Sequence, residues 1–451
     1  MPTPWRNCTH CTSRQRWLHD TMKSLEDIAA ALQGYDPQAL PAHVVNAFLG
    51  QWVPAPQRTE TVALMQALGR VLAEDVVCPI DVPAHDNSAM DGYAFDGGQL
   101  DSASPLRLQV LGTARAGSAY AGVIAAGQCV KVMTGAVMPA GLDTVVPQEL
   151  VKADGDTITI PPGLLRLGDN RRQAGEDLRQ GSAALTRGAR ITPAALGLIA
   201  SLGIAQVTVY ARLRVAYFST GDEILSLGDA PREGAVYDSN RYTVFGMLQR
   251  MGIEVLDLGV VPDQPAALQA AFERAAREAD ATITSGGVSV GEADHTKAMM
   301  RQLAQSAPDG TGGGVVFWRI AMRPGRPMAV GRIGHKPLFG LPGNPVAVMV
   351  TFLAFVRPAL WQMMGAKVSE PPLLQARSSE AIRKKPGRTE YQRAIVSTGS
   401  DGALTVRTTG QQGSGVLSSM VQANGLLVLT HAQGDVAVGD LVSVMLFDGV
   451  L

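Results

Sequence analysis

The spacing of apolar residues changes several times along the chain and divides it into regions of different structure. Within residues 40–73 apolar side chains recur at helical spacing, which predicts two helices. Residues 76–168 instead carry short β-branched runs separated by Gly, Pro and Asp, which predicts a mostly β module. The strands expected in this module are 106–111, 129–133, 144–147 and 157–160. A further helix is predicted over residues 193–202.

Strands and helices alternate beyond residue 213. The pattern predicts strands at 214–219, 254–261 and 281–284 and helices at 239–251, 265–279 and 295–305. This alternation is typical of βαβ units, so we expect a doubly wound parallel α/β sheet. The longest apolar run, 346–356, is far shorter than the roughly 20 residues that span a bilayer, and it predicts a buried core helix.

Short alternating strands return after residue 365, at 393–397, 404–407, 425–429 and 441–446. Gly-rich turns separate them, which predicts a small C-terminal β-barrel or sandwich. The fold class expected from the whole pattern is therefore multidomain, with α/β and β parts.

Composition and charge exclude several classes of protein. Hydrophobic residues make up 46% of the 451 residues and charged residues 18%, which excludes an intrinsically disordered chain. Lys and Arg (39) balance Asp and Glu (40), so we expect no nucleic-acid partner and no membrane partner. Four Cys cannot form a disulfide framework, which favours the cytoplasm.

The first 34 residues form a polar leader that contains Cys8 and Cys11. This pair is half of a zinc site, but no second pair follows at a usable spacing. The leader is either a disordered segment or a metal-binding one, and no functional inference depends on it.

Two loops that follow predicted strands carry acidic residues and glycines. In open α/β sheets ligands bind beyond the carboxyl ends of the strands, where residues 219–223 and 284–294 lie. The pair Gly286 and Gly287 lets backbone N–H groups approach a ligand closely. The acidic side chains expected at this edge suit Mg²⁺, although solvated helix caps and tight turns are the alternative; they are Asp222, Glu223, Asp263 and Asp294.

A cluster of arginines lies further along the chain, within residues 319–326. In a strand Arg319 and Arg323 share a face, and a Pro-Gly turn directs Arg326 back toward them. Three guanidiniums in an otherwise neutral chain predict an oxyanion site, with arginines solvated at a sheet edge as the alternative. Residues 341–345 open the buried helix nearby, and its N–H groups would add to such a site.

These loops match a known family, motif by motif and in order. The chain resembles the molybdopterin molybdenumtransferases, the bacterial enzymes related to the E domain of gephyrin. The matching motifs are DNSAMDGYA (86–94), MTGA with the following Pro (133–139), AGED (174–177), STGDE (219–223), TSGGVSVGEAD (284–294), RPGRP (323–327), LPGNP (341–345) and ANGLLVL (423–429).

The resemblance implies an elongated homodimer with four domains in each subunit. After the leader (1–34), an elongated helical dimerisation domain would comprise 35–77 and 171–212, and an inserted β module 78–170. A molybdopterin-binding α/β domain (213–364) and a C-terminal β domain (365–451) would follow. The site would lie between the α/β domain of one subunit and the β module of its partner.

The resemblance also implies an activity. The substrates would be adenylylated molybdopterin and molybdate, with Mg²⁺ as the cofactor; hydrolysis of the adenylate would accompany molybdenum insertion and give molybdenum cofactor and AMP. The molybdopterin adenylyltransferase and the enzymes that accept the cofactor would be further partners. No nucleophilic Cys or Ser paired with His is evident, so we expect no covalent intermediate.

Roles transfer to this chain only at the matching positions. Asp222, Glu223, Asp263 and Asp294 would bind Mg²⁺ or direct the adenylate, and Ser285, Gly286, Gly287 and Ser289 would hold the pterin and phosphate. Asp91, Thr134 and Asp177 would contribute from the partner subunit. Molybdate would be held by Arg319, Arg323, Arg326, Pro342, Pro345, Arg388, Arg393 and Ser414. Arg replaces a Lys that is usual in the PGKP-type stretch, which changes the geometry offered to molybdate or tungstate.

Two other functions remain open at this point. Related α/β domains with a TSGG-type loop adenylylate molybdopterin, and a scaffold could keep the fold without the chemistry. All these readings depend on one spatial expectation, namely that the carboxylates and the guanidiniums face the same crevice.

Overall fold

A computed structural model describes residues 40–287, 315–367 and 371–448. The leader, the predicted helix at 295–305, Ser289 and Asp294 lie outside these residues. The chain divides into two compact units. The first contains the described residues up to Thr59, residues 69–71 and everything from Tyr210 onward, and the second contains Glu60–Leu68 and Leu72–Val209.

The first unit is built on a six-stranded sheet with the order β16-β13-β17-β21-β20-β18. The first four strands are parallel and β20 is antiparallel to both its neighbours. Their bounds are β13 (Arg214–Thr220), β16 (Glu254–Val261), β17 (Ala281–Ser285), β18 (Val315–Arg319), β20 (Pro327–Ile333) and β21 (Lys336–Leu341). The predicted α/β sheet is therefore confirmed.

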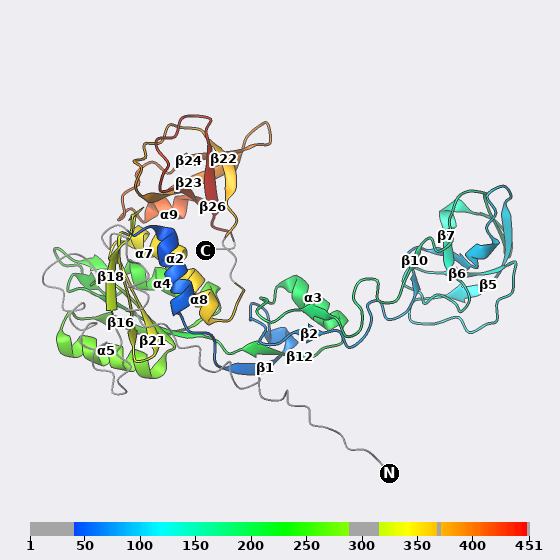
Figure 1. The fold of residues 1–451 in the computed structure, drawn as a ribbon, viewed down its shortest axis with the longest axis horizontal. Coiled ribbons are helices and arrows are strands. Elements are labelled where there is room, and N and C mark those ends of the chain that lie inside the picture. Colours follow the sequence, from blue (N-terminus) through cyan, green and yellow to red (C-terminus); the bar gives the residue numbers. More distant parts are fainter. Residues whose placement is uncertain (1–39, 288–314, 368–370, 449–451) are drawn as a thin grey trace, which may run out of the picture. The chain divides into compact units, whose positions relative to one another are not determined.

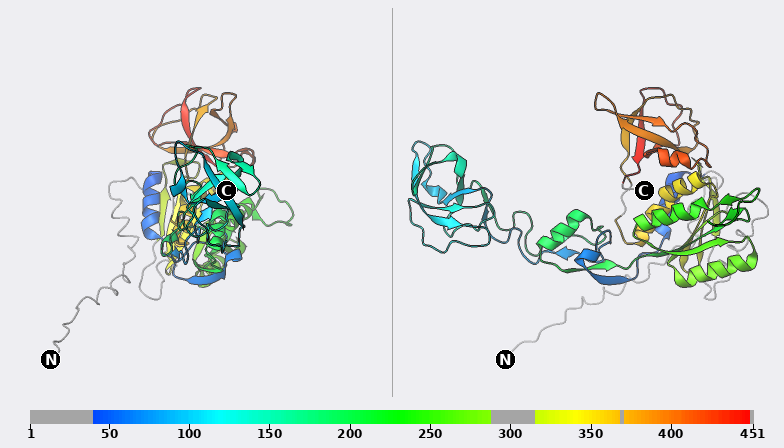
Figure 2. Two further views of the ribbon diagram at one scale, coloured as in Figure 1. Left: turned by 90° about the vertical axis from the view of Figure 1, so that its right-hand side faces the viewer. Right: turned by 180° about the vertical axis from the view of Figure 1, so that it is seen from behind.

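Helices cover both faces of this sheet (Figures 1 and 2). Helix α5 (Pro265–Glu278) packs on one face, where Phe272 meets Phe218 edge to face with ring centroids 5.1 Å apart. The opposite face carries α4 (Ser239–Arg250) and α7 (Pro345–Thr351), which contact each other. A small parallel pair, β14 (Ile224–Leu225) and β15 (Val236–Tyr237), precedes α4.

The predicted core helix is longer than its apolar run. It extends from Pro345 to Met363 through α7, a π-helical turn (Phe352–Val356) and α8 (Arg357–Met363). Among the described residues it is the one helix with the length and composition of a membrane span, and 67% of its apolar window is buried inside the protein. That burial is typical of a core helix.

Helix α2 (Ala42–Trp52) packs in this first unit. Phe48 and Trp318 meet edge to face at 4.7 Å, and α2 contacts α8. Arg332 caps its end by donating to the Trp52 carbonyl at 2.6 Å while its guanidinium lies over the Trp52 ring. By contacts this segment belongs to the first unit, and the expected helical domain of 35–77 and 171–212 stays a prediction.

The C-terminal strands close into a barrel that also belongs to the first unit. Strand β23 pairs with β24 along one half and with β25 along the other, so β23-β24-β22-β26-β25 form a ring. The short strand β19 (Met322–Arg323) joins it by pairing with β23. The barrel elements are β22 (Leu374–Ser378), β23 (Thr389–Thr398), β24 (Leu404–Thr408), α9 (Ser418–Gln422), β25 (Gly425–Leu429) and β26 (Leu441–Leu446).

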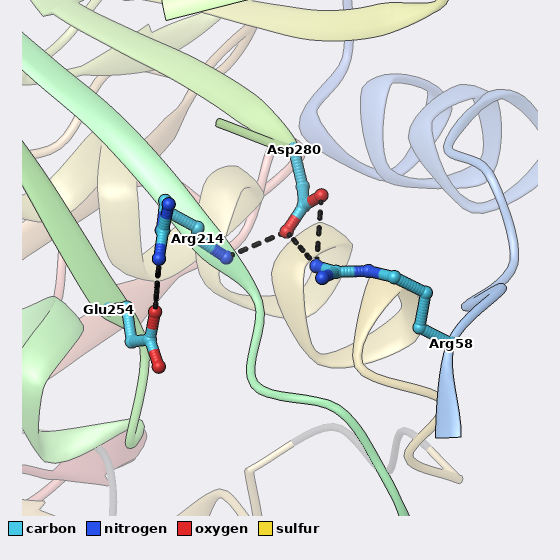
Figure 3. A network of polar contacts seen from close by, with 4 residues as sticks. All are labelled: Arg58, Arg214, Glu254 and Asp280. Carbon is cyan, nitrogen blue, oxygen red and sulfur yellow. Dashed lines mark hydrogen bonds and ion pairs between the residues drawn. The ribbon is translucent and has the colours of Figure 1, made fainter. Parts of the chain in front are cut away.

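A network of ion pairs closes the amino-terminal edge of the α/β sheet (Figure 3). Asp280, just before β17, accepts from Arg58 at 3.1 Å and from the Arg214 N–H at 2.8 Å. The Arg214 guanidinium in turn meets Glu254 at 3.2 Å. These contacts tie the segment that follows α2 to the starts of three parallel strands.

The second unit contains a six-stranded sheet with the order β7-β4-β6-β5-β9-β8. Its strands are β4 (Gly92–Phe95), β5 (Leu106–Ala114), β6 (Gln128–Val132), β7 (Thr144–Pro147), β8 (Lys152–Asp154) and β9 (Thr157–Ile160), with 3₁₀ turns at Gly97–Gln99 and Gln148–Leu150. All four predicted strands of the β module are thus confirmed, and both of its free cysteines described here, Cys78 and Cys129, are buried.

The remainder of the second unit has its own core around helix α3 (Pro193–Ser201), with Ile199 fully buried. Two-stranded pairs surround it: β1 (Thr59–Ala63) with β12 (Gln206–Tyr210), and β2 (Val76–Val77) with β11 (Ala183–Leu185). The second helix predicted within residues 40–73 is wrong, because that segment forms β1 and a 3₁₀ turn (Leu64–Gln66). Its apolar residues pack on α3 from an extended backbone, where Val62 faces inward and its neighbours outward.

Candidate functional site

The motif loops of the first unit gather at one edge of the α/β sheet. Residues 262–264, 221–223, 286–287 and 342–345 follow the carboxyl ends of β16, β13, β17 and β21, which are consecutive in the sheet. Because β20 is antiparallel to β21, the RPGRP turn that precedes β20 lies at the same edge. The backbones of these loops therefore lie along one edge of the sheet, as expected.

A cationic pocket lies where this edge meets the C-terminal barrel. Its volume is about 530 Å³. The lining residues come from the 322–327 turn, the start of α7 and two barrel segments; they are Met322, Arg323, Pro324, Gly325, Arg326, Pro327, Pro342, Gly343, Asn344, Ala347, Arg388, Gln412, Gly413 and Ser414. Three arginines and no carboxylate belong to this set. Such a site favours an anion.

The turn that carries two of these arginines is held from both sides. The Ile320 N–H donates to the Arg326 carbonyl at 2.7 Å, which closes the loop, and β19 pairs Arg323 with Glu390 of the barrel. Gly325 has a φ of +91°, and a Cβ there would overlap Thr351 Oγ1. Only glycine allows the turn to lie this close to α7.

Hydrogen bonds connect the start of α7 to α4 and to the C-terminal barrel. Asn240 of α4 donates to the Gly343 carbonyl at 2.7 Å, and the Val346 N–H donates to the Ser414 carbonyl of the barrel at 3.1 Å. The Val346 N–H, one of the helix N–H groups expected to face an anion, is therefore already hydrogen-bonded to the barrel. Pro345 sits at the first turn of the helix and fixes its direction.

The three pocket arginines differ in how far they are neutralised. Arg388 donates to Glu390 Oε1 through both Nε (2.8 Å) and Nη2 (2.7 Å), and Glu390 is 2% exposed. Arg323 and Arg326 are exposed, and neither side chain has a hydrogen-bond or ion-pair partner in the described part of the chain. Within the described residues, two positive charges of the pocket are therefore uncompensated, which matches a dianion.

Three other residues predicted to hold molybdate lie outside the pocket lining: Arg319, Arg393 and Pro345. Arg319 ends β18, with its exposed side chain on the strand that leads to the turn. It does not continue into one strand with Arg323 as expected, because β18 stops there and β19 pairs with the barrel. Arg393 is 1% exposed, and burial together with nearby Arg323 lowers its pKa to about 10.

The acidic residues line the same edge at a distance of several strands from the pocket. Asp222 and Glu223 are exposed after β13, and Asp263 is half-buried after the neighbouring β16. No group of three potential metal ligands is present among the described residues. These acidic residues follow strands that end at the same sheet edge, but the charged residues of the pocket lining are all basic, so the expected shared crevice stays a prediction.

A cluster of hydroxyls fixes the end of β17. Ser285 Oγ lies 2.6 Å from the Tyr217 hydroxyl and 3.1 Å from Ser219 Oγ, and all three side chains are buried. Burial raises the pKa of Tyr217 far above its usual range. The Ser285 side chain therefore faces the interior, and the following Gly286 (φ +88°) presents backbone at the edge.

The three β-module motifs also converge, within the second unit. Strands β3 (Asn87–Ser88) and β10 (Arg171–Arg172) pair, and the Gly135 N–H donates to the Ser88 carbonyl at 2.8 Å. Thr134 donates to Asp91 Oδ1 from both its N–H and its hydroxyl at 2.7 Å, which lowers the pKa of Asp91. The third motif joins them through Ala174, whose N–H donates to Asp86 Oδ1 at 2.8 Å, and Asp177 of this motif is exposed.

Sequence reasoning missed part of the pocket. Gln412 and Gly413 form its barrel wall, and buried Glu390 pairs with Arg388, but none of the three stands in a recognised motif. A Gly-rich stretch at 410–415 was the available signal for the wall. Glu390 alternates with half-buried positions at the start of β23 and gave no signal of its own.

Comparison with known families accounts for the parts of this fold. The MoeA N-terminal region (domain I and II) matches residues 37–203, a probable molybdopterin binding domain matches 216–362, and the MoeA C-terminal region (domain IV) matches 375–447. These define a protein of the molybdopterin-handling class.

Full-length relatives narrow the assignment. The molybdopterin molybdenumtransferase of Haemophilus influenzae is 40% identical over 401 residues, 88% of this chain and 96% of that protein. Molybdopterin molybdenumtransferase 2 of Mycobacterium tuberculosis is 36% identical over 85% of this chain and 93% of its own length. The molybdopterin biosynthesis moeA protein from Pyrococcus horikoshii superposes with a TM-score of 0.75 at 28% identity, covering 90% of this chain and 100% of that one. The chain belongs to the molybdopterin molybdenumtransferase family.

Proposed function

We propose that this protein inserts molybdenum from molybdate into adenylylated molybdopterin, with hydrolysis of the adenylate, to give molybdenum cofactor and AMP. It is a transferase of molybdenum cofactor biosynthesis, as its relatives are named. The observation that carries the proposal is the pocket: within the described residues, the guanidiniums of Arg323 and Arg326 have no partner and the lining holds no acidic side chain. A small oxyanion such as molybdate is the substrate that this charge balance fits.

The same pocket favours insertion over adenylylation of molybdopterin. Its walls include Arg388, Gln412, Gly413 and Ser414 from the C-terminal barrel, which an isolated α/β domain lacks. The barrel also supplies the carbonyl that occupies the start of α7. A non-catalytic scaffold would have no need for two exposed arginines held in one turn, because such charges repel each other when no anion is present.

The acidic residues of the edge suit Mg²⁺. This ion is usually held by one or two carboxylates together with substrate phosphates and water, so it needs no cluster of three acids. Asp222 and Glu223 after β13, Asp263 after β16 and, beyond the described residues, Asp294 would hold it. Bound there, Mg²⁺ would neutralise the adenylate phosphate and favour its attack by water.

The residues of this chain then have separate tasks. Arg323 and Arg326 hold the oxyanion, Pro342 and Pro345 fix the turn beside it, and Gly286 and Gly287 give the pterin and phosphate access to backbone N–H groups. Holding both reactants along one sheet edge converts a dilute encounter into a positioned one. The active form would be a cytoplasmic homodimer in which the second subunit contributes Asp91, Thr134 and Asp177.

The test is turnover by the purified full-length protein. Adenylylated molybdopterin, Mg²⁺ and molybdate should give AMP and a cofactor that activates an apo-molybdoenzyme, and AMP release should depend on molybdate. Arg326→Ala should raise the KM for molybdate, whereas Arg407→Ala, an exposed arginine on β24 of the same barrel, should not. AMP release that ignores molybdate, or adenylyl transfer from ATP to molybdopterin, would contradict the proposal.

A further inference from the structure

Arg393 is a buried arginine that lacks an acidic partner in the described part of the chain. Its Nε donates to Ser419 Oγ at 2.9 Å, Nη1 to the Gln412 carbonyl at 3.3 Å, and Nη2 to the carbonyls of Gln411 (3.1 Å) and Gly413 (2.9 Å). Buried arginines are normally paired with a carboxylate. Here four donor contacts go to neutral oxygens instead, so the side chain binds a segment of backbone.

The backbone of the same residue completes this arrangement. The Arg393 N–H donates to Gln412 Oε1 at 2.9 Å, and Gln412 Nε2 donates back to the Arg393 carbonyl at 3.1 Å. Residues 411–413 are thereby held against β23 by both the side chain and the main chain of one residue. Because Gln412 also lines the pocket, its position there depends on this contact.

The segment held by Arg393 leads directly into the oxyanion pocket. Gln412, Gly413 and Ser414 form the barrel wall, and the Ser414 carbonyl accepts the Val346 N–H of α7 at 3.1 Å. Arg393 itself is not part of the lining. A chain of contacts therefore runs from the Arg393 guanidinium through residues 411–414 to the helix that opens beside the pocket.

We propose that Arg393 is a positioning residue for the oxyanion site, which sets the 411–414 wall by binding its carbonyl groups and does not itself bind the anion. The inference rests on the proposed function, because it concerns how the molybdate pocket is shaped. It assigns the contacts to the anion to Arg323 and Arg326, and it gives Arg393 the separate task of fixing the wall opposite them. An anion ligand would need donors that face the cavity, whereas the Arg393 donors are already engaged with the wall.

Substitution of Ser419 distinguishes a positioning role of Arg393 from direct binding of the anion by Arg393. Ser419 is buried and lies outside the pocket lining; its Oγ accepts the Nε–H of Arg393 and donates to the Val416 carbonyl at 2.6 Å. Ser419→Ala therefore removes one Arg393 anchor and this local contact, and leaves every charge in place. Arg393→Lys keeps the charge but cannot reach several carbonyls with a fixed fork. A positioning role predicts loss in both variants, whereas a ligand role predicts little loss for Ser419→Ala.

The experiment measures molybdate binding by titration calorimetry on the full-length protein and, in parallel, turnover. We expect about a tenfold or greater loss of affinity for Arg393→Lys and about a threefold loss for Ser419→Ala, with Arg407→Lys on β24 unchanged as the matched control. In turnover, the KM for molybdate should rise while the KM for adenylylated molybdopterin stays constant.

Hydrogen exchange distinguishes a displaced wall from an unfolded protein. Peptides that contain residues 411–414 should exchange faster in both variants without anion, while peptides from β13 and β17 should keep wild-type protection. Wild-type affinity for Ser419→Ala with unchanged exchange at 411–414 would overturn the inference. If the wild-type protein itself bound no molybdate, the proposed function would fail instead, so the two failures are distinguishable.

Discussion

Gly325→Ala tests whether the oxyanion turn depends on its close approach to α7. Gly325 has a φ of +91°, which costs an alanine about 1–2 kcal/mol because its Cβ approaches its own backbone. The new Cβ would also lie less than 3.0 Å from Thr351 Oγ1. Forcing an extra carbon into a packed site costs typically about 1–3 kcal/mol. We therefore expect a loss of about 2–5 kcal/mol in the free energy of unfolding of the first unit.

The two contributions separate in a double-mutant cycle. Thr351 is fully buried, and its Oγ1 has no hydrogen-bond partner among the residues that the structure describes, so Thr351→Ala removes the overlapping atom at little polar cost. In the Gly325→Ala background this change should recover the overlap contribution and leave the φ contribution. Thr351→Val is the matched control, because it places a carbon where Oγ1 stood and should recover nothing.

Urea unfolding followed by tryptophan fluorescence measures the change. Trp52, Trp318 and Trp361 lie in the first unit, and replacing Trp5 and Trp17 of the leader by Phe leaves only these three as reporters. Gly325→Ala should also weaken molybdate binding, since the turn carries Arg323 and Arg326. Equal recovery by the Ala and Val substitutions, or a Gly325→Ala protein as stable as wild type, would refute the steric argument.

Three further substitutions have defined outcomes. Tyr217→Phe breaks the buried hydroxyl cluster and should lower the free energy of unfolding in the same urea assay by about 1 kcal/mol; an unchanged value would show that the cluster adds nothing. Glu390→Gln removes the negative charge that pairs with Arg388 and should tighten molybdate binding by about 1 kcal/mol in calorimetry, where weaker binding would contradict the charge argument. Thr134→Val removes one of the two hydrogen bonds that lower the pKa of Asp91, so an NMR titration should show this pKa rising toward its ordinary value. A carboxyl group with a lowered folded-state pKa stabilises the protein above its ordinary pKa, and this stability is lost as the pH falls through the folded-state pKa. The variant should therefore lose that stability at a higher pH than wild type. An unchanged Asp91 pKa would contradict this account.

The sequence was most informative where the pattern of apolar residues had one period over a whole element. Strand β16 spans Glu254–Val261 as predicted, and α4 and α5 end within a residue of their expected limits. Prediction failed at residues 59–63, where an apparent helical spacing forms a strand. Short apolar runs fit both periods, and here the tertiary core around α3 decides between them.

The sequence motifs predicted which segments form the site, but not which of its arginines are buried or paired with an acidic residue. The turn with Arg323 and Arg326 and the start of α7 do share a pocket. Burial of Arg393 and pairing of Arg388 with Glu390 depend on how β23 lies in the barrel, which is a long-range property. The sequence presents five arginines as equivalent candidates, and only the packing shows that Arg393 is buried and that Arg388 is paired.

The pocket walls come from segments that are far apart in the order of synthesis. The 322–327 turn leaves the ribosome well before Arg388 and residues 412–414, and the barrel ring closes only when β26 pairs with β22 and β25. During translation the nascent α/β domain would therefore expose its arginines without a complete site. The protein would gain the capacity to retain an oxyanion as one of the last events of its folding, after every other part of the sheet edge is in place.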